Sequence, residues 1–202
     1  MKRGLKCMIG GLAGLQLFAC SALAATQPHT VSAGETMWKI AVKYQVGVSE
    51  IISANPQIAN PNLIYPNQIL QIPVMDNTVS SYEQQVIDLV NEIRRNNGLN
   101  PLKANWELSR VARYKSQDMY NNRYFSHTSP VYGTPFQMMK NFGISYRSAA
   151  ENIAKGQRTP QEVVNAWMNS SGHRANILNA SYTQIGVGYV STGNYWTQMF
   201  IG

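Results

Sequence analysis

The position of the cysteines constrains this chain more than any other single feature. The sequence of 202 residues contains two cysteines, Cys7 and Cys20, and both lie close to its start. Everything that follows them must fold without disulfide bonds, so its stability must come from core packing. An apolar content of 44% is enough to build such a core. The same residues have no thiol for nucleophilic attack and no thiolate for a metal site.

The segment that holds both cysteines has the pattern of an export signal. Positive side chains come first, followed by an apolar run over residues 8–19 that is shorter than the roughly 20 residues needed to span a bilayer. A small-x-small cleavage site at residues 22–24 predicts that residues 1–24 are a signal peptide and that the protein is secreted. Two alternatives stay open, a retained membrane anchor and a lipid attached to Cys20.

The net charge limits the partners of the mature chain. Without residues 1–24 the chain has 14 Lys and Arg residues against 10 Asp and Glu residues, which leaves a net charge of +4. A mild positive charge suits an anionic surface such as a cell wall. The sequence has no stripe of Lys and Arg that would predict binding to nucleic acid.

The first folded segment, residues 27–74, alternates between extended and helical patterns. Thr36 is a good helix N-cap, and the pair Asn55-Pro56 is a good helix stop. The predicted elements are a strand at residues 29–31, a helix at residues 37–44, a second helix that Ser49 opens, and a strand at residues 68–72. The order is therefore strand, helix, helix, strand in fewer than 50 residues.

This order resembles a LysM domain over its whole length, on the stretches HTVSAGETMWKIA, VSEIISANPQI and NLIYPNQILQIP. The resemblance implies a small βααβ domain that binds glycans containing N-acetylglucosamine, in bacteria chiefly peptidoglycan. The groove of the family lies between two loops, here residues 33–37 and 58–64. The candidate glycan-binding residues are therefore Gly34, Glu35, Thr36, Met37, Leu63 and Ile64.

The chemistry of an acetamido sugar fits these loops, although a second interpretation stays open. The amide of the sugar needs hydrogen-bond partners, and its methyl group needs an apolar floor. In the alternative, Met37, Leu63 and Ile64 are simply core residues. Two positions depart from the family pattern, namely Glu35 in place of the more frequent Asp and Asn67 in place of a frequent Gly. Asn tolerates a left-handed backbone, so we expect the turn at Asn67 to be retained.

Residues 75–81 show no periodicity and are predicted to be a short linker that keeps the two domains close together. The second domain, residues 82–202, begins with helices and ends with a hairpin. Its predicted elements are helices at residues 82–97 and 106–122, helices opened by Thr134-Pro135 and Thr159-Pro160, and strands at residues 185–190 and 195–201.

Three local features of this second domain have specific interpretations. Gly186 and Gly188 share one face of their strand, which predicts the close approach of another backbone or of a ligand. The cluster at residues 94–97 is interpreted as a solvated helix end and not as a binding patch. Arg174 is expected to form a surface ion pair, with contact to an anionic ligand as the alternative.

Five motifs in this domain occur in the order of a CAP domain, also called an SCP or pathogenesis-related-1 domain. They are NEIRRNNGLNPL, SHTSP, AENIA, WMNSSGHRANIL, and IGVGY followed by YWTQMF. The resemblance implies an α-β-α sandwich with a central antiparallel sheet, so the whole chain is expected to be α+β. The cleft histidines of the family match His127 and His173, and its glutamate matches Glu151. A second glutamate of many members is replaced here by Ser170.

The resemblance makes His127, Glu151 and His173 the candidate site, and two interpretations of it stay open. In the first, the two imidazoles bind a zinc-like divalent cation weakly, and Glu151 orients one ring or binds the cation through water. In the second, Glu151 only pairs with one histidine and pins two loops together, at residues 126–130 and 171–174. Two histidines are fewer protein ligands than zinc sites usually have. Three further side chains are expected to brace the loops and not to react, namely Tyr124, Asn152 and Asn176.

Two functions follow from this sequence. The first is a secreted envelope protein that docks on peptidoglycan through its LysM domain and presents a CAP domain with a binding or assembly role, with an envelope protein as a further partner. Its setting is the cell wall or the spore surface, because the LysM segment also resembles those of spore-coat proteins. The second is a secreted hydrolase, metal-dependent in one version, that uses His127, Glu151 and His173 as catalytic residues.

Overall fold

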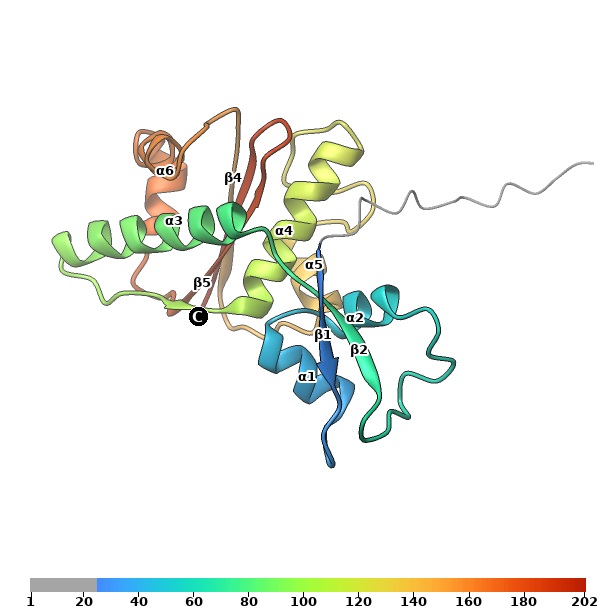
Figure 1. Cartoon of the computed structure of the whole chain (residues 1–202). Helices are drawn as coiled ribbons and strands as arrows, with labels where there is room; N and C mark the ends of the chain where they lie inside the picture. Colours follow the sequence, from blue (N-terminus) through green and yellow to red (C-terminus); the bar gives the residue numbers. More distant parts are fainter. Residues whose placement is uncertain (1–24) are drawn as a thin grey trace, which may run out of the picture.

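A computed structural model describes residues 25–202 of the chain (Figure 1). The predicted signal peptide and the alternative lipid site at Cys20 lie outside the described residues. Within them, no helix is both long and apolar enough to cross a membrane. The described chain forms a small N-terminal domain and a larger C-terminal domain, both of mixed helices and strands, as the α+β prediction requires.

The N-terminal domain has the predicted βααβ order. Its elements are β1 (Thr26–Thr30), α1 (Met37–Tyr44), α2 (Val48–Ala54) and β2 (Ile69–Pro73), and the two strands pair antiparallel. The side chain of Thr36 caps α1 by accepting a hydrogen bond from the backbone N–H of Lys39. Apolar side chains from both helices and from β2 form a buried core, which includes Ile40, Ile51 and Leu70. The strand β1 starts earlier than predicted, because its pairing with β2 begins at Thr26.

The junction between the domains is shorter than predicted. The helix α3 (Asn77–Asn96) starts inside the expected linker of residues 75–81, so the linker prediction is wrong from Asn77 onward. The cause is Asp76, whose carboxylate accepts hydrogen bonds from the backbone N–H groups of Thr78 and Val79 and caps the helix. On the other side, the N–H of Val74 donates to the carbonyl of Ala25.

The C-terminal domain is the expected α-β-α sandwich. Its other helices are α4 (Trp106–Asn121), α5 (Pro135–Asn141), α6 (Pro160–Met168) and α7 (Ser171–Ile177), and its strands are β3 (Lys103–Ala104), β4 (Ala149–Lys155), β5 (Gln184–Val190) and β6 (Tyr195–Ile201). The sheet order is β3-β5-β6-β4, in which β6 pairs antiparallel with β4 and β5 and the two-residue β3 is parallel to β5.

The two larger cores of this domain show which helices cover each face of the sheet (Figure 1). On one face, α3, α6 and α7 pack on β5 and β6 around Trp167, Trp196 and Phe200. On the other face, α4 and α5 pack around Leu108 and Met199. Because strand side chains alternate between faces, β6 contributes residues to both cores. The strand β4 lies at the edge of the sheet, and this position matters for the site.

The predicted glycine pair brings α4 unusually close to β5. A Cβ atom on Gly186 would overlap the backbone of Leu108 and Ser109, and one on Gly188 would overlap the backbone of Ala112 and Arg113. The prediction of a close approach is confirmed, and the approaching group is the backbone of α4.

Arg94 corrects one sequence interpretation. The residue was expected at a solvated helix end, but its side chain is buried at 1% exposure. Its guanidinium donates hydrogen bonds to the carbonyl oxygens of Asn100, Ile177 and Asn179 at 2.7–2.9 Å. A signal was present in the sequence, because Arg94 continues the spacing of the buried Val86 and Val90. Arg94 therefore ties the end of α3 to the end of α7.

We expect Arg94→Ala to destabilise the C-terminal domain by about 3 kcal/mol, because it leaves buried carbonyl groups without their charged donor. Urea unfolding of residues 25–202 measures this change. The matched control is Arg95→Ala at the exposed neighbour, which should change stability by less than about 0.5 kcal/mol. Equal stability of the two variants would contradict the structural role of Arg94.

Candidate functional site

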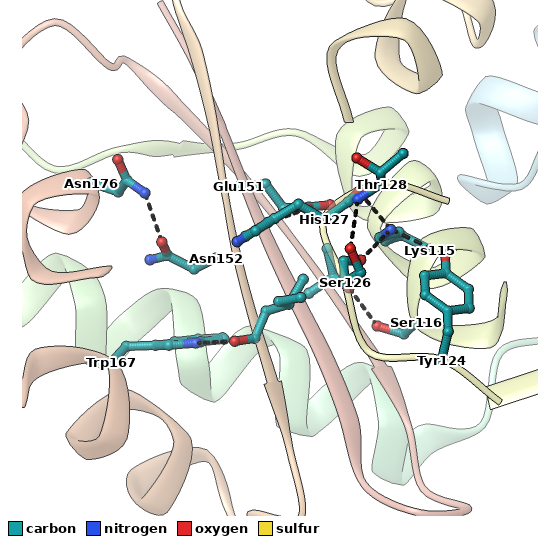
Figure 2. A network of polar contacts seen from close by, with 12 residues as sticks. Lys115, Ser116, Tyr124, Ser126, His127, Thr128, Glu151, Asn152, Trp167 and Asn176 are labelled. Carbon is teal, nitrogen blue, oxygen red and sulfur yellow. Dashed lines mark hydrogen bonds and ion pairs between the residues drawn. The ribbon is translucent and has the colours of Figure 1, made fainter. Parts of the chain in front are cut away.

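His127 lies in the loop between α4 and α5 and contacts Glu151 on β4. The ring nitrogen Nδ1 is 2.8 Å from Oε1 of Glu151 (Figure 2). The imidazole is 53% exposed, whereas the glutamate side chain is 1% exposed. The buried carboxylate thus fixes the ring from behind, and Nε2 is the nitrogen that a ligand can reach. The predicted pairing of Glu151 with one histidine is what the structure shows.

Lys115 holds the backbone of this loop in place (Figure 2). The whole residue is buried. Its ammonium donates to the carbonyl oxygens of Ser126 and His127, both at 2.8 Å, and to the hydroxyl of Tyr124 at 3.1 Å. Burial lowers the pKa of Lys115, while the charges of Glu151 and Asp118 act in the opposite direction.

Asp118 fixes the same loop one helical turn further along α4. Its carboxylate accepts hydrogen bonds from the hydroxyls of Ser129, at 2.6 Å, and Tyr124. The hydroxyl oxygen of Ser129 in turn accepts from the N–H groups of Val131 and Tyr132. The bracing role predicted for Tyr124 is therefore confirmed. The sequence analysis missed Lys115 and Asp118 as loop anchors, although their spacing of three residues on one helix face was a signal.

His173 lies on α7, where the sequence analysis expected a loop over residues 171–174. That expectation is wrong, because the helix begins at Ser171 and His173 belongs to its first turn. The side-chain amide of Asn152 donates to the carbonyl of His173 at 3.2 Å and accepts from Asn176 at 2.8 Å. The predicted bracing role of Asn152 and Asn176 is confirmed. Arg174 donates to the carbonyl of Met168 and has no ion pair within residues 25–202, so the expected pair is wrong.

The two histidines belong to opposite layers of the sandwich. Glu151 and Asn152 are neighbours on β4, so their side chains point to opposite faces of the sheet. Glu151 meets the layer that holds His127, and Asn152 meets the layer that holds His173. Burial lowers the pKa of His173, and the charge of His127 lowers it further. The structure thus pairs His127 with Glu151 directly, whereas no hydrogen bond or ion pair within residues 25–202 links the side chain of His173 to either of them.

One carboxylate oxygen of Glu151 is free to form a further hydrogen bond. Its Oε2 atom is buried and has no hydrogen-bond partner among the described residues. Burial raises the pKa of Glu151, whereas the hydrogen bond with His127 and the charge of Lys115 oppose that rise. A carboxylate behind an imidazole fixes its tautomer and makes the opposite nitrogen a better acceptor or ligand. The arrangement suits binding of a polar group at Nε2.

Binding of a divalent cation by His127 and His173 stays a prediction. Within residues 25–202, no group of three or more His, Cys, Asp or Glu side chains is arranged to hold a metal ion. A cation at this cleft would therefore depend on His127 and His173, with Glu151 behind one ring. This is a smaller protein ligand set than the three or four of most zinc sites.

The candidate glycan-binding residues divide into exposed and buried groups. Gly34 and Thr36 face solvent, and Leu63 is 52% exposed. Met37 is buried in the core and Ile64 packs against that core, so the alternative core interpretation is correct for these two side chains. The side chain of the remaining candidate, Glu35, contacts residues of its own domain.

Glu35 stabilises the first loop of the predicted groove. Its Oε2 atom accepts a hydrogen bond from the N–H of Ser32 and lies 2.8 Å from Nε2 of the buried His29. These contacts, with the hydrogen bond from Ser32 first and the bond with His29 next, lower the pKa of Glu35. Lys39 donates to the carbonyl of Gly34 at 2.7 Å. The role of Glu35 in the structure is therefore to hold the loop.

A hollow lies beside the second loop of the predicted groove. Its volume is about 500 Å³, and it is lined by Ile58, Leu63 and Tyr65 together with amide side chains. The sequence analysis missed Tyr65, which is 58% exposed, although an aromatic residue in a polar loop was a signal. Asn67 has a φ of 69°, so the expected left-handed turn is confirmed.

Removal of the charge at His127 should change the titration of His173. In His127→Gln, we expect the pKa of His173 to be higher than in the wild type. It should rise only part of the way to the ordinary value of a histidine, because burial is the larger cause of the lowering. Nuclear magnetic resonance of the imidazole protons measures both curves. An unchanged titration in the variant would show that the two rings do not share a cleft.

In the wild type, the lowered pKa of His173 also means that the stability of the fold falls as the pH drops below about 6.5.

Comparison with protein families identifies both domains. The model of the cysteine-rich secretory protein family, named CAP, matches residues 87–200. The LysM domain model matches residues 29–73. The two matches fall on the C-terminal sandwich and on the N-terminal βααβ domain, respectively.

Individual relatives and solved structures agree with these matches. The uncharacterized protein YkwD of Bacillus subtilis is 62% identical over 125 residues, which cover 62% of this chain and 49% of that protein. The N-acetylmuramoyl-L-alanine amidase sle1 of Staphylococcus aureus is 40% identical over 68 residues, which cover 31% of this chain and 20% of that protein. An extracellular protein of Bacillus anthracis that contains an SCP domain has a solved structure with a TM-score of 0.60 and 33% identity, covering 67% of this chain and 47% of that one.

The chain spans about half or less of the length of each of these proteins. The family match nevertheless covers more than half of this chain, and the observed α-β-α sandwich agrees with it. The chain therefore belongs to the cysteine-rich secretory protein family, and it carries a LysM domain in front of its CAP domain.

Proposed function

We propose that this protein binds peptidoglycan through its LysM domain and holds its CAP cleft at the wall for a binding or assembly role. The observation that carries the proposal is the solvent-facing hollow of about 500 Å³ in a domain that matches the LysM family. Its lining combines an exposed leucine and an exposed tyrosine with four amide side chains, from Gln57, Asn60, Asn67 and Gln68.

This lining fits the chemistry of an N-acetylated sugar. Amide side chains both donate and accept hydrogen bonds, as the acetamido group and the ring hydroxyls require. Leu63 and Tyr65 supply an apolar surface for the acetyl methyl group and for the face of the sugar ring. One matched relative is named an N-acetylmuramoyl-L-alanine amidase, and that linkage joins the glycan of peptidoglycan to its peptide.

Export and location are part of the same proposal. The signal-like segment of residues 1–24 supports secretion, and the net charge of +4 of the remaining chain supports retention at an anionic wall. The setting is the vegetative cell wall or the spore envelope. An envelope protein is the partner that an assembly role would require.

The cleft geometry favours binding over hydrolysis. A histidine held by a buried carboxylate is a good base, but a covalent mechanism also needs a nucleophile beside it. In the part of the chain that the structure describes, no serine or threonine hydroxyl is hydrogen-bonded to His127 or His173. Ser170 caps α7 without a side-chain hydrogen bond to the helix, and its hydroxyl has no base in contact.

The LysM assignment predicts that residues 25–202 sediment with purified sacculi and that deletion of residues 25–74 abolishes this. Within the hollow, Tyr65→Ala should weaken binding about tenfold, because it removes an exposed aromatic contact surface. A sedimentation isotherm measures the affinity.

The matched control for this experiment is Ile69→Ala. Ile69 is 57% exposed, similar to Tyr65, but it does not line the hollow. We expect the control to bind as the wild type does. Sedimentation of the deleted protein, or equal losses in the two point variants, would contradict the proposal.

The role of the cleft predicts that His173→Ala sediments with sacculi as the wild type does and that neither protein releases muropeptides. The physical reason is that His173 lies on α7, within the CAP domain. Chromatography of the soluble fraction after incubation detects released fragments. Fragments released by the wild type and absent with His173→Ala would instead support the hydrolase.

A further inference from the structure

The LysM and CAP domains contact one another at a second place, away from their covalent junction. Glu50 on α2 and Arg110 on α4 form an ion pair with 3.2 Å between Nη1 and Oε1. Both side chains are mostly buried, at 25% exposure for the glutamate and 17% for the arginine. An exposed ion pair contributes little to stability, but burial reduces the screening of this one.

Aromatic side chains of the CAP domain enclose the arginine. The guanidinium carbon of Arg110 lies 5.3 Å from the ring centre of Phe142 and 5.9 Å from that of Tyr114. Both distances fall within the range of cation–π interactions. Burial and the adjacent Glu50 charge raise the pKa of Tyr114 to about 12, which also places this tyrosine at the contact. The CAP domain thus supplies both the positive charge that pairs with Glu50 on α2 and the aromatic rings that surround this charge.

Gly47 lies directly beside the ion pair of Glu50 and Arg110. A Cβ atom at this position would overlap the carboxylate of Glu50 and the guanidinium of Arg110. The backbone of Gly47 has a φ of −74°, which any residue adopts, so the conformation does not require glycine. The nearest atoms are the movable ends of the Glu50 and Arg110 side chains, so a larger residue here would have to displace their ion pair.

The covalent junction leaves little freedom for rotation. Val74 is hydrogen-bonded to Ala25 in the LysM domain, and Asp76 is the N-cap of α3 in the CAP domain. Met75 is therefore the single residue between these two anchored positions. Domains joined by longer linkers usually move relative to one another. A one-residue junction together with a separate ion pair constrains both the distance and the rotation.

We propose that the LysM and CAP domains form one rigid body, with Gly47, Glu50 and Arg110 as the docking contact. The surface of α4 that carries Arg110 is, in this view, an interface for the LysM domain of the same chain. The glycan hollow and the histidine cleft then keep a constant separation and direction. A wall strand held by the first domain always meets the cleft from the same side. The rigidity itself does not depend on what either domain binds.

Distance measurements between two spin labels test this proposal. Residues 25–202 contain no cysteine, so Ser53→Cys on α2 and Gln161→Cys on α6 provide two specific labelling positions on exposed residues. Double electron–electron resonance on this labelled protein should give one narrow distance distribution. The same distribution should broaden in Arg110→Ala and in Gly47→Val, because each removes the docking contact.

Controls separate docking from general damage. Arg95→Ala removes an exposed arginine of α3 and should leave the distribution narrow. The exchange Glu50→Arg with Arg110→Glu should restore a narrower distribution than Arg110→Ala shows. Circular dichroism confirms that each variant is folded. A broad distribution in the unaltered protein, or a narrow one in both folded contact variants, would overturn the proposal.

Discussion

The close packing of α4 on β5 fixes the helix that supports both the His127 loop and the contact with the LysM domain. Gly186 and Gly188 allow the backbone of the helix to rest directly on the strand. From this fixed position, α4 extends Lys115 and Asp118 toward the His127 loop and Arg110 toward the LysM domain. One helix thus sets both the cleft and the domain contact, so a shift of α4 would disturb them together.

Burial of charged groups is the means by which the domain holds its loops. The ammonium of Lys115 has three N–H donors, and the three oxygen atoms around it use all of them. Arg94 joins the ends of α3 and α7 through carbonyl oxygens in the same way. An unpaired buried charge would be very costly, so each of these side chains is compatible with only one loop arrangement. This explains how a chain without disulfides in residues 25–202 keeps long loops in register.

Local sequence signals predicted the helix starts well, because a cap acts within one turn. Thr36, Thr134 and Thr159 all cap helices as expected. The family motifs, and not composition or spacing, identified His127, Glu151 and His173. Arg94 continues the buried spacing of Val86 and Val90, but its carbonyl partners at Ile177 and Asn179 are more than 80 residues away, so local sequence patterns could not identify them. The junction was misjudged because Asp76 was not recognised as a cap.

The position of the cleft at the edge of β4 has a consequence for its ligand. The histidines come from opposite layers, so their separation depends on the thickness of the sandwich at this edge and not on one rigid loop. Asn152 holds α7 against the strand, and Glu151 holds His127 on the other side. A bound group that contacts both rings would therefore bridge two layers and stabilise their packing, as a ligand stabilises any fold that it binds selectively.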